Sequence, residues 1–205
     1  MIPEKQIMTG DVDKFRTYEF NQSEILTMMG GTVKGTAAAK GICQELCWKW
    51  MKRMRTKTDK YSTSKGRMDA LWKDSTVNKA IDRHNKATQL SVPQDFYNIP
   101  KNNYQSKWGY DKGMIDNWRL KGGGLFISVA CPKYKNEKHA ISFYTPASIT
   151  NTAVFFFDPN EGEYQLKFGD FYKFLPDFLE NKYWAKISDI VEIVVYGDPK
   201  QVGKG

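Results

Sequence analysis

The fold of this 205-residue chain is indicated by three segments that occur in a fixed order. They are Gly41-Ile42-Cys43-Gln44-Glu45-Leu46-Cys47-Trp48-Lys49-Trp50, then His139-Ala140-Ile141-Ser142-Phe143, and then Phe155-Phe156-Phe157-Asp158-Pro159-Asn160. The first has its apolar residues at helical spacing, and the other two are typical of β-strands. They predict a helix that begins with a thiol, a strand that begins with an imidazole, and a strand that ends with a carboxylate.

The patterns around these segments indicate an α+β order, in which helices come first and strands afterwards. Helical spacing predicts helices near 22–29 and over 42–54, 75–90 and 168–184. Runs of β-branched and aromatic residues predict strands at 125–130, 140–144, 152–157 and 190–196. Polar and turn-forming residues predict irregular chain at 56–66 and 93–113. We therefore expect the thiol-bearing helix to pack across an antiparallel sheet made from residues after 124.

The composition is that of a protein with a core of its own. Because 40% of the residues are hydrophobic and 14% are aromatic, disorder over the whole chain is not expected. No apolar run approaches the roughly 18 residues of a membrane-spanning helix, and residues 1–6 do not resemble a Sec-type signal peptide. Three cysteines are too few, and odd in number, for a disulfide framework. We expect a reduced, cytosolic working environment, in the producing cell or in a cell that receives the protein.

The chain has a formal net charge of +8, and much of the excess lies in a basic stretch at 49–67. Its basic residues are opposed only by Asp59; they are Lys49, Lys52, Arg53, Arg55, Lys57, Lys60, Lys65 and Arg67. Such a stretch either attracts an anionic membrane surface or an acidic partner, or simply forms a solvated face. No zinc-finger spacing, RNA-binding signature or Walker-type loop accompanies it, so nucleic acid is not an expected partner. The histidines and cysteines show no ligand spacing, so neither a metal nor another cofactor is expected.

Cys43 is the candidate nucleophile because the predicted helix over 42–54 begins there. A helix N-terminus carries partial positive charge and unpaired N–H groups, and both favour a thiolate. Gly41, just before it, leaves room for a substrate to approach the sulfur. Cys47 lies one turn further into the helix, where a cysteine is more often a small buried apolar residue.

His139 is the candidate base and Asp158 the candidate acid. The other histidine, His84, lies in a highly charged helical segment, where a solvated side chain is expected. His139 lies where a polar loop enters an apolar strand, and Asp158 ends the next strand, so its carboxylate could accept from the imidazole N–H. Three nearby polar residues rank below Asp158 as the acid; they are Glu163, Asp170 and Asn160. Together the three candidates have the parts of a cysteine nucleophile activated by an oriented histidine.

These local strings resemble the YopT/AvrPphB-type bacterial effector peptidases, which are papain-like cysteine peptidases. The nucleophile segment of that family has the form Gly-x-Cys-x-x-Leu with a following Trp, here Gly41 to Trp50. Its acid lies in a string similar to Phe156-Phe157-Asp158-Pro159-Asn160-Glu161-Gly162-Glu163-Tyr164. The resemblance covers roughly residues 36–197. It implies a papain-like catalytic domain at 36–197, an N-terminal arm at 1–35 and a C-terminal tail at 198–205.

The resemblance implies cleavage of a peptide bond in a protein of a target cell. It also implies delivery from the bacterial cytoplasm by a specialised secretion system, and a cognate chaperone or immunity protein as a further partner. The same triad deamidates or transamidates glutamine side chains in papain-like toxins, and the sequence does not separate these reactions. A non-catalytic alternative is a basic binding module, built on the stretch at 49–67, in which the triad has decayed.

One position departs from the papain-like pattern. These enzymes usually place a Gln or Asn five to six residues before the nucleophile to help bind the oxyanion, and here those positions are Ala37 and Ala38. Loss of one oxyanion donor costs about 2.7–4 kcal/mol in a serine protease. The Cys43 backbone N–H can supply one donor. The candidates for a second are side chains elsewhere; they are Gln22, Gln44 and Asn21.

Overall fold

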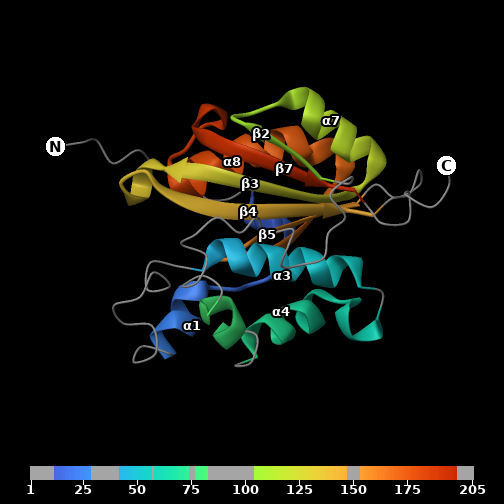
Figure 1. Cartoon of the computed structure of the whole chain (residues 1–205), viewed down its shortest axis with the longest axis vertical. Helices are drawn as coiled ribbons and strands as arrows, with labels where there is room; N and C mark the ends of the chain where they lie inside the picture. The colour runs from blue at the N-terminus through green and yellow to red at the C-terminus, as the bar shows by residue number, and fades with distance from the viewer. Residues whose placement is uncertain are drawn as a thin grey trace.

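A seven-stranded sheet forms the centre of the protein (Figure 1). The computed structural model describes residues 12–28, 42–56, 58–73, 77–82, 104–146 and 153–197. The strands are β1 (Arg16–Tyr18), β2 (Tyr104–Trp108), β3 (Gly123–Cys131), β4 (Glu137–Thr145), β5 (Ala153–Asp158), β6 (Gly162–Lys167) and β7 (Ile190–Tyr196). Their order across the sheet is β1-β6-β5-β4-β3-β7-β2, and each neighbouring pair is antiparallel.

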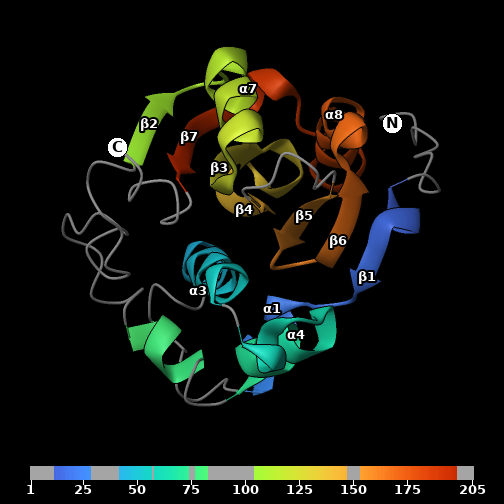
Figure 2. The same ribbon diagram turned by 90° about the vertical axis from the view of Figure 1, so that its right-hand side faces the viewer.

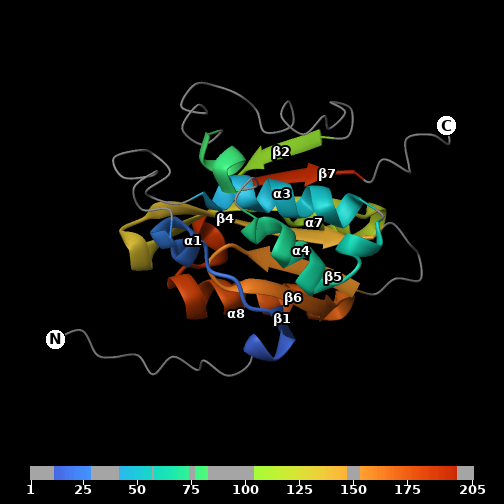
Figure 3. The same cartoon turned by 90° about the horizontal axis from the view of Figure 1, so that it is seen from below.

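Helices cover both faces of this sheet (Figures 1 and 2). One face carries α1 (Gln22–Met28), α3 (Cys43–Arg55) and α4 (Ser64–Trp72), and the other carries α7 (Lys112–Lys121) and α8 (Phe171–Tyr183). Short 3-10 turns connect these elements; they are η1 (Asp13–Phe15), η3 (Asp59–Tyr61), η5 (Pro132–Tyr134), η6 (Phe168–Asp170) and η7 (Ile187–Asp189). Residues 77–82 are also helical. In the view of Figure 3, α3 and α4 lie in front of the strands of the sheet.

The two layers of helices follow from strands that are apolar on both faces. In β3, Leu125 and Ile127 belong to the core under α7 and α8, whereas Phe126 between them belongs to the core under α3. Successive side chains of a strand point to opposite faces, so a continuous apolar run has to be covered twice. Each core contains contacts between aromatic rings, such as Phe156 against α8 and Phe157 against Trp50 of α3.

The predicted mixture of helices and an antiparallel sheet is confirmed, with helices at 43–55 and 171–183 and strands β3, β4, β5 and β7. The short helix expected near 22–29 is α1. Of the helix expected over 75–90, residues 77–82 are described and helical, and the rest lies outside the described residues.

The prediction of irregular chain was wrong in two places. Residues 104–108 form β2 and residues 112–121 form α7, which the sequence analysis missed. The ends of α7 carry standard signals, because Asp111 accepts from the Met114 N–H as N-cap and Gly122 ends the helix at φ 75°. Likewise α4 begins at Ser64, inside the expected loop at 56–66, and the Thr63 side chain caps it. The side chains of residues 105–108 of β2 are exposed at the edge of the sheet, so these residues carry no pattern of buried apolar positions.

The sheet also takes a strand from the N-terminal segment, so it is not made only from residues after 124. β1 pairs with β6, and Phe20 and Ile25 are 1% and 2% exposed. Gly162, within the acid-bearing string, has φ 123°, and a Cβ there would lie 2.0 Å from the Tyr18 carbonyl oxygen. A glycine is therefore required where β1 approaches. Residues 12–28 of the predicted arm thus pack against the sheet.

Candidate active site

Three elements that lie far apart in the sequence bring Cys43, His139 and Asp158 together. Cys43 is the first residue of α3, His139 is the third residue of β4, and Asp158 is the last residue of β5. α3 packs on β4, where Cys47 donates from Sγ to the Ala140 carbonyl oxygen at 3.3 Å. This contact fixes the start of α3 beside the first residues of β4.

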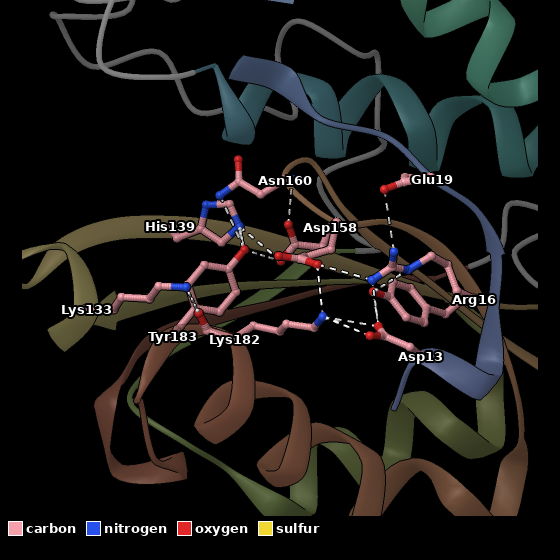
Figure 4. Close-up of polar contacts among 11 residues, drawn as sticks. Asp13, Arg16, Glu19, Lys133, His139, Asp158, Asn160, Lys182 and Tyr183 are labelled. Carbon is pink, nitrogen blue, oxygen red and sulfur yellow. Dashed lines mark hydrogen bonds and ion pairs between the residues drawn. The ribbon is translucent and has the colours of Figure 1, made fainter. Parts of the chain in front are cut away.

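The imidazole and the carboxylate face each other, with Asn160 above them and Tyr183 of α8 below them in the view of Figure 4. His139 Nε2 lies 3.1 Å from Asp158 Oδ2, and the two side chains are 7% and 0% exposed. The Asp158 carboxylate is also held from the other side, because Oδ1 accepts from the Asn160 backbone N–H at 2.7 Å. Asn160 is therefore a neighbour that orients the acid, and Asp158 is the carboxylate that faces the imidazole.

Tyr183, the last residue of α8, completes this group. Its hydroxyl donates to Asp158 Oδ2 at 2.7 Å and lies 3.0 Å from His139 Nε2. Its ring covers the imidazole, with the ring centroids 4.7 Å apart (Figure 4). The sequence analysis missed this role, since Tyr183 looks like one more apolar position on the buried stripe of the helix over 168–184.

The Cys43 thiol and the His139 side chain interact electrostatically, and each shifts the pKa of the other. Burial alone would raise the pKa of Cys43, but His139 and the backbone groups of Ala140 and Gln44 lower it below the usual value of a thiol. Burial alone would lower the pKa of His139, but Asp158 and Cys43 raise it to about 10. Both shifts favour a thiolate–imidazolium pair.

The other two cysteines have the opposite character. Cys47 and Cys131 are buried, whereas Cys43 is partly exposed. Burial raises the pKa of Cys47 well above its usual value and raises the pKa of Cys131 to about 12. Both are therefore expected to remain protonated thiols, as the sequence analysis expected for Cys47.

The three predicted oxyanion side chains lie in different places. Gln22 is the one attached to the nucleophile helix, since its Oε1 accepts from the Ile42 N–H at 2.9 Å. The Asn21 carboxamide accepts from the Ser23 N–H at the start of α1. The side chain of Gln44 is exposed. Gly41, Ala37, Ala38 and His84 lie outside the described residues.

The basic stretch at 49–67 is partly internal. Arg67 is 4% exposed and makes two charge-assisted hydrogen bonds to Glu163, which is 0% exposed. Arg53 donates to the carbonyl oxygens of Lys49 and Ala70. Because a helix rises about 1.5 Å per residue, the C-terminal end of α3 at Arg55 lies about 18 Å from Cys43. The basic side chains of that end are therefore remote from the thiol.

Within the described residues, no group of three or more histidine, cysteine, aspartate or glutamate side chains could hold a metal ion. No helix in the part of the chain that the structure describes is long and apolar enough to cross a membrane.

Comparison with known proteins finds a similarity in structure that sequence comparison does not detect. No protein-family model matches the chain, and no curated protein matches it in sequence. The crystal structure of the Pseudomonas avirulence protein AvrPphB does match, with a TM-score of 0.54 and 13% sequence identity. The match covers 90% of this chain and 97% of AvrPphB. The chain therefore has the papain-like fold of AvrPphB, the fold that the motifs predicted.

Proposed function

We propose that this protein is a cysteine peptidase of bacterial effector or toxin type, with Cys43, His139 and Asp158 as its triad. The observation that supports this most directly is the His139–Asp158 hydrogen bond, together with the pKa shifts by which Cys43 and His139 stabilise each other's charged forms. It lies on a fold shared with AvrPphB, a cysteine peptidase effector of the family that the motifs resemble. The substrate class is a protein of a target cell.

The proposed reaction begins with a thiolate. Since His139 Nε2 faces Asp158 and Tyr183, Nδ1 is the ring nitrogen available to Cys43. The thiolate attacks the carbonyl carbon, an S–C bond forms, and the carbonyl electrons move to the oxygen. The Cys43 N–H, one of the unpaired donors at the start of α3, can bind this oxyanion. The C–N bond then breaks as the imidazolium gives its proton to the leaving amine.

A water molecule completes the reaction. His139, now neutral, takes a proton from the water as it attacks the thioester carbonyl, and the acid product leaves with Cys43 restored as the thiolate. The same groups would release ammonia if the attacked carbonyl belonged to a glutamine side chain. Deamidation or transamidation is therefore the second candidate function, and it uses the same atoms of the site.

A comparison of the wild type with Cys43→Ala tests the proposal. Each protein is incubated with a lysate of candidate target cells, and new protein N-termini and glutamine-to-glutamate changes are read by mass spectrometry. The peptidase proposal requires new N-termini that depend on Cys43. Glutamate formation without new N-termini would favour the deamidase. Neither product, together with binding to a lysate protein, would favour a non-catalytic module.

A further inference from the structure

Gln22 of α1 is bonded to both halves of the candidate site. Its backbone N–H donates to the Pro159 carbonyl oxygen at 2.7 Å, and its Nε2 donates to Asn160 Oδ1 at 2.7 Å. On the opposite side, its Oε1 accepts from the Ile42 N–H at 2.9 Å. Gln22 is 5% exposed, so these hydrogen bonds form largely out of contact with water and replace water on groups that would be costly to leave unpaired.

Each of these bonds ends next to a residue of the proposed triad. Ile42 directly precedes Cys43, and Asn160 holds the Asp158 carboxylate through its backbone N–H. Asn160 also donates from Nδ2 to the Tyr183 hydroxyl at 3.3 Å. A continuous chain of hydrogen bonds therefore runs from the acid, through Asn160 and Gln22, to the start of the nucleophile helix.

The start of α3 has no side-chain cap of its own. The N-cap is Ile42, which has no side chain to accept from the first N–H groups. The Ile42 N–H instead donates to the side chain of Gln22, which belongs to α1. No capping side chain accepts from the first N–H groups of α3. The backbone N–H of Gln44 can therefore interact with the Cys43 sulfur, and this helps to lower the pKa of Cys43.

We propose that Gln22 is a positioning residue, which holds the start of α3 against the Asp158–Asn160 turn and so sets the separation between Cys43 and His139. This inference rests on the proposed function, since it concerns the same site. It differs from the oxyanion role expected from the sequence, because a positioning residue acts before any substrate carbonyl is bound. A small displacement of α3 would weaken the thiolate–imidazolium pair.

Alkylation of Cys43 by iodoacetamide separates these two roles. The thiolate displaces iodide from a saturated carbon, so no oxyanion forms and an oxyanion donor does not change the rate. Gln22→Met keeps the length of the side chain and removes its hydrogen bonds. We expect the pH midpoint of alkylation to rise by about one unit, which lowers the rate about tenfold at pH values well below the wild-type midpoint. Asn160→Ala should shift the midpoint in the same direction, and the double variant should be no slower than Gln22→Met.

Ile25→Val is the matched control, because Ile25 is a core residue of the same helix and takes no part in these hydrogen bonds. It should lower the thermal stability and leave the alkylation midpoint unchanged. A folded Gln22→Met protein with the midpoint of the wild type would overturn the inference, as would an equal shift in Ile25→Val. If Gln22→Met does not fold, Asn160→Ala decides alone. A wild type that reacts as an ordinary thiol would refute the proposed function itself, whereas a reactive wild type with an unchanged Gln22→Met refutes only the role of Gln22.

Discussion

The Tyr183 hydroxyl donates its hydrogen to Asp158 Oδ2 at 2.7 Å. Because that hydrogen is used on the carboxylate, the hydroxyl oxygen can only accept from His139 Nε2, which lies 3.0 Å away. Asp158 Oδ2 likewise accepts a hydrogen bond from His139 Nε2. Two acceptors at Nε2 fix the hydrogen of a neutral imidazole there and leave Nδ1 as the proton acceptor for Cys43.

Removing the Tyr183 hydroxyl should therefore slow the reaction without abolishing it. Tyr183→Phe retains the ring that covers the imidazole, and we expect kcat/KM to fall about tenfold. Combined with Asp158→Asn, it should cost little more than Asp158→Asn alone, since both side chains act on Nε2. Tyr134→Phe is the control, because its ring contacts Tyr183 at 6.0 Å but its hydroxyl makes none of the bonds of the site. Full additivity of the two losses would contradict the shared action.

Replacing the acid should cost less than replacing the nucleophile or the base. In Asp158→Asn the charge that raises the pKa of His139 is lost, so the imidazolium is less stable and its pKa falls. The Tyr183 ring still restrains the imidazole, and we expect a loss of about 10²- to 10³-fold in kcat, smaller than for a triad without this restraint. The alkaline limb of the pH–rate profile should move to lower pH. A limb that stays in place would show that Asp158 does not act on His139.

Cys43→Ala and His139→Ala should each lower activity by at least about 10⁴-fold and leave the fold intact. Cys47→Ser is the matched thiol variant. It should keep most of the activity and lose about 1 kcal/mol of stability, since the buried hydroxyl is more polar than the thiol but can still donate to the Ala140 carbonyl oxygen. Activity assays and thermal unfolding measure both effects. An active Cys43→Ala beside an inactive Cys47→Ser would mean that Cys47 is the nucleophile.

The buried Arg67–Glu163 pair should be essential for stability and not for chemistry. Glu163 also accepts from Trp50 Nε1 and from Ser64 Oγ, so it ties α3 and α4 to β6. Arg67→Ala leaves this carboxylate buried and unpaired, and we expect a loss of about 3–5 kcal/mol in the free energy of unfolding. Lys65→Ala, which breaks an exposed pair with Asp69 in the same helix, should cause no measurable change. Equal effects of the two substitutions would contradict this.

The strands and helices found from the sequence were those with a strong apolar pattern. β3, β4, β5, β7, α3 and α8 bury one or both faces, and their periodicity is visible without any tertiary information. β2 and α4 were missed, because an exposed edge strand and a polar short helix carry little of that signal. β6 was missed since Gly162 and Glu163 are poor strand residues in isolation, and both are required by contacts with distant segments.

Some residues of the candidate site could likewise be predicted from the sequence, and others could not. Cys43, His139 and Asp158 could be chosen because their residue types and places on their elements suit the chemistry. The role of Tyr183 and the contacts of Gln22 could not be predicted, because each depends on where a side chain meets another element 20 or more residues away. The sequence of the basic stretch at 49–67 suggested a single exposed surface. The buried pair of Arg67 with Glu163 could not be predicted, because it joins residues that only the fold brings together.

The pH dependence of Cys43 alkylation by iodoacetamide, followed by mass spectrometry of the intact protein, tests the central claim most directly. The pKa of Cys43 is lowered and that of His139 is raised to about 10, so the thiolate–imidazolium pair should form at a lower pH than an ordinary thiol ionises and persist up to about pH 10. We predict rapid alkylation of Cys43 alone at pH 6, and its loss in His139→Ala. Alkylation of Cys43 that is negligible at pH 6 and rises only near pH 8.5, as for an ordinary thiol, would contradict the account.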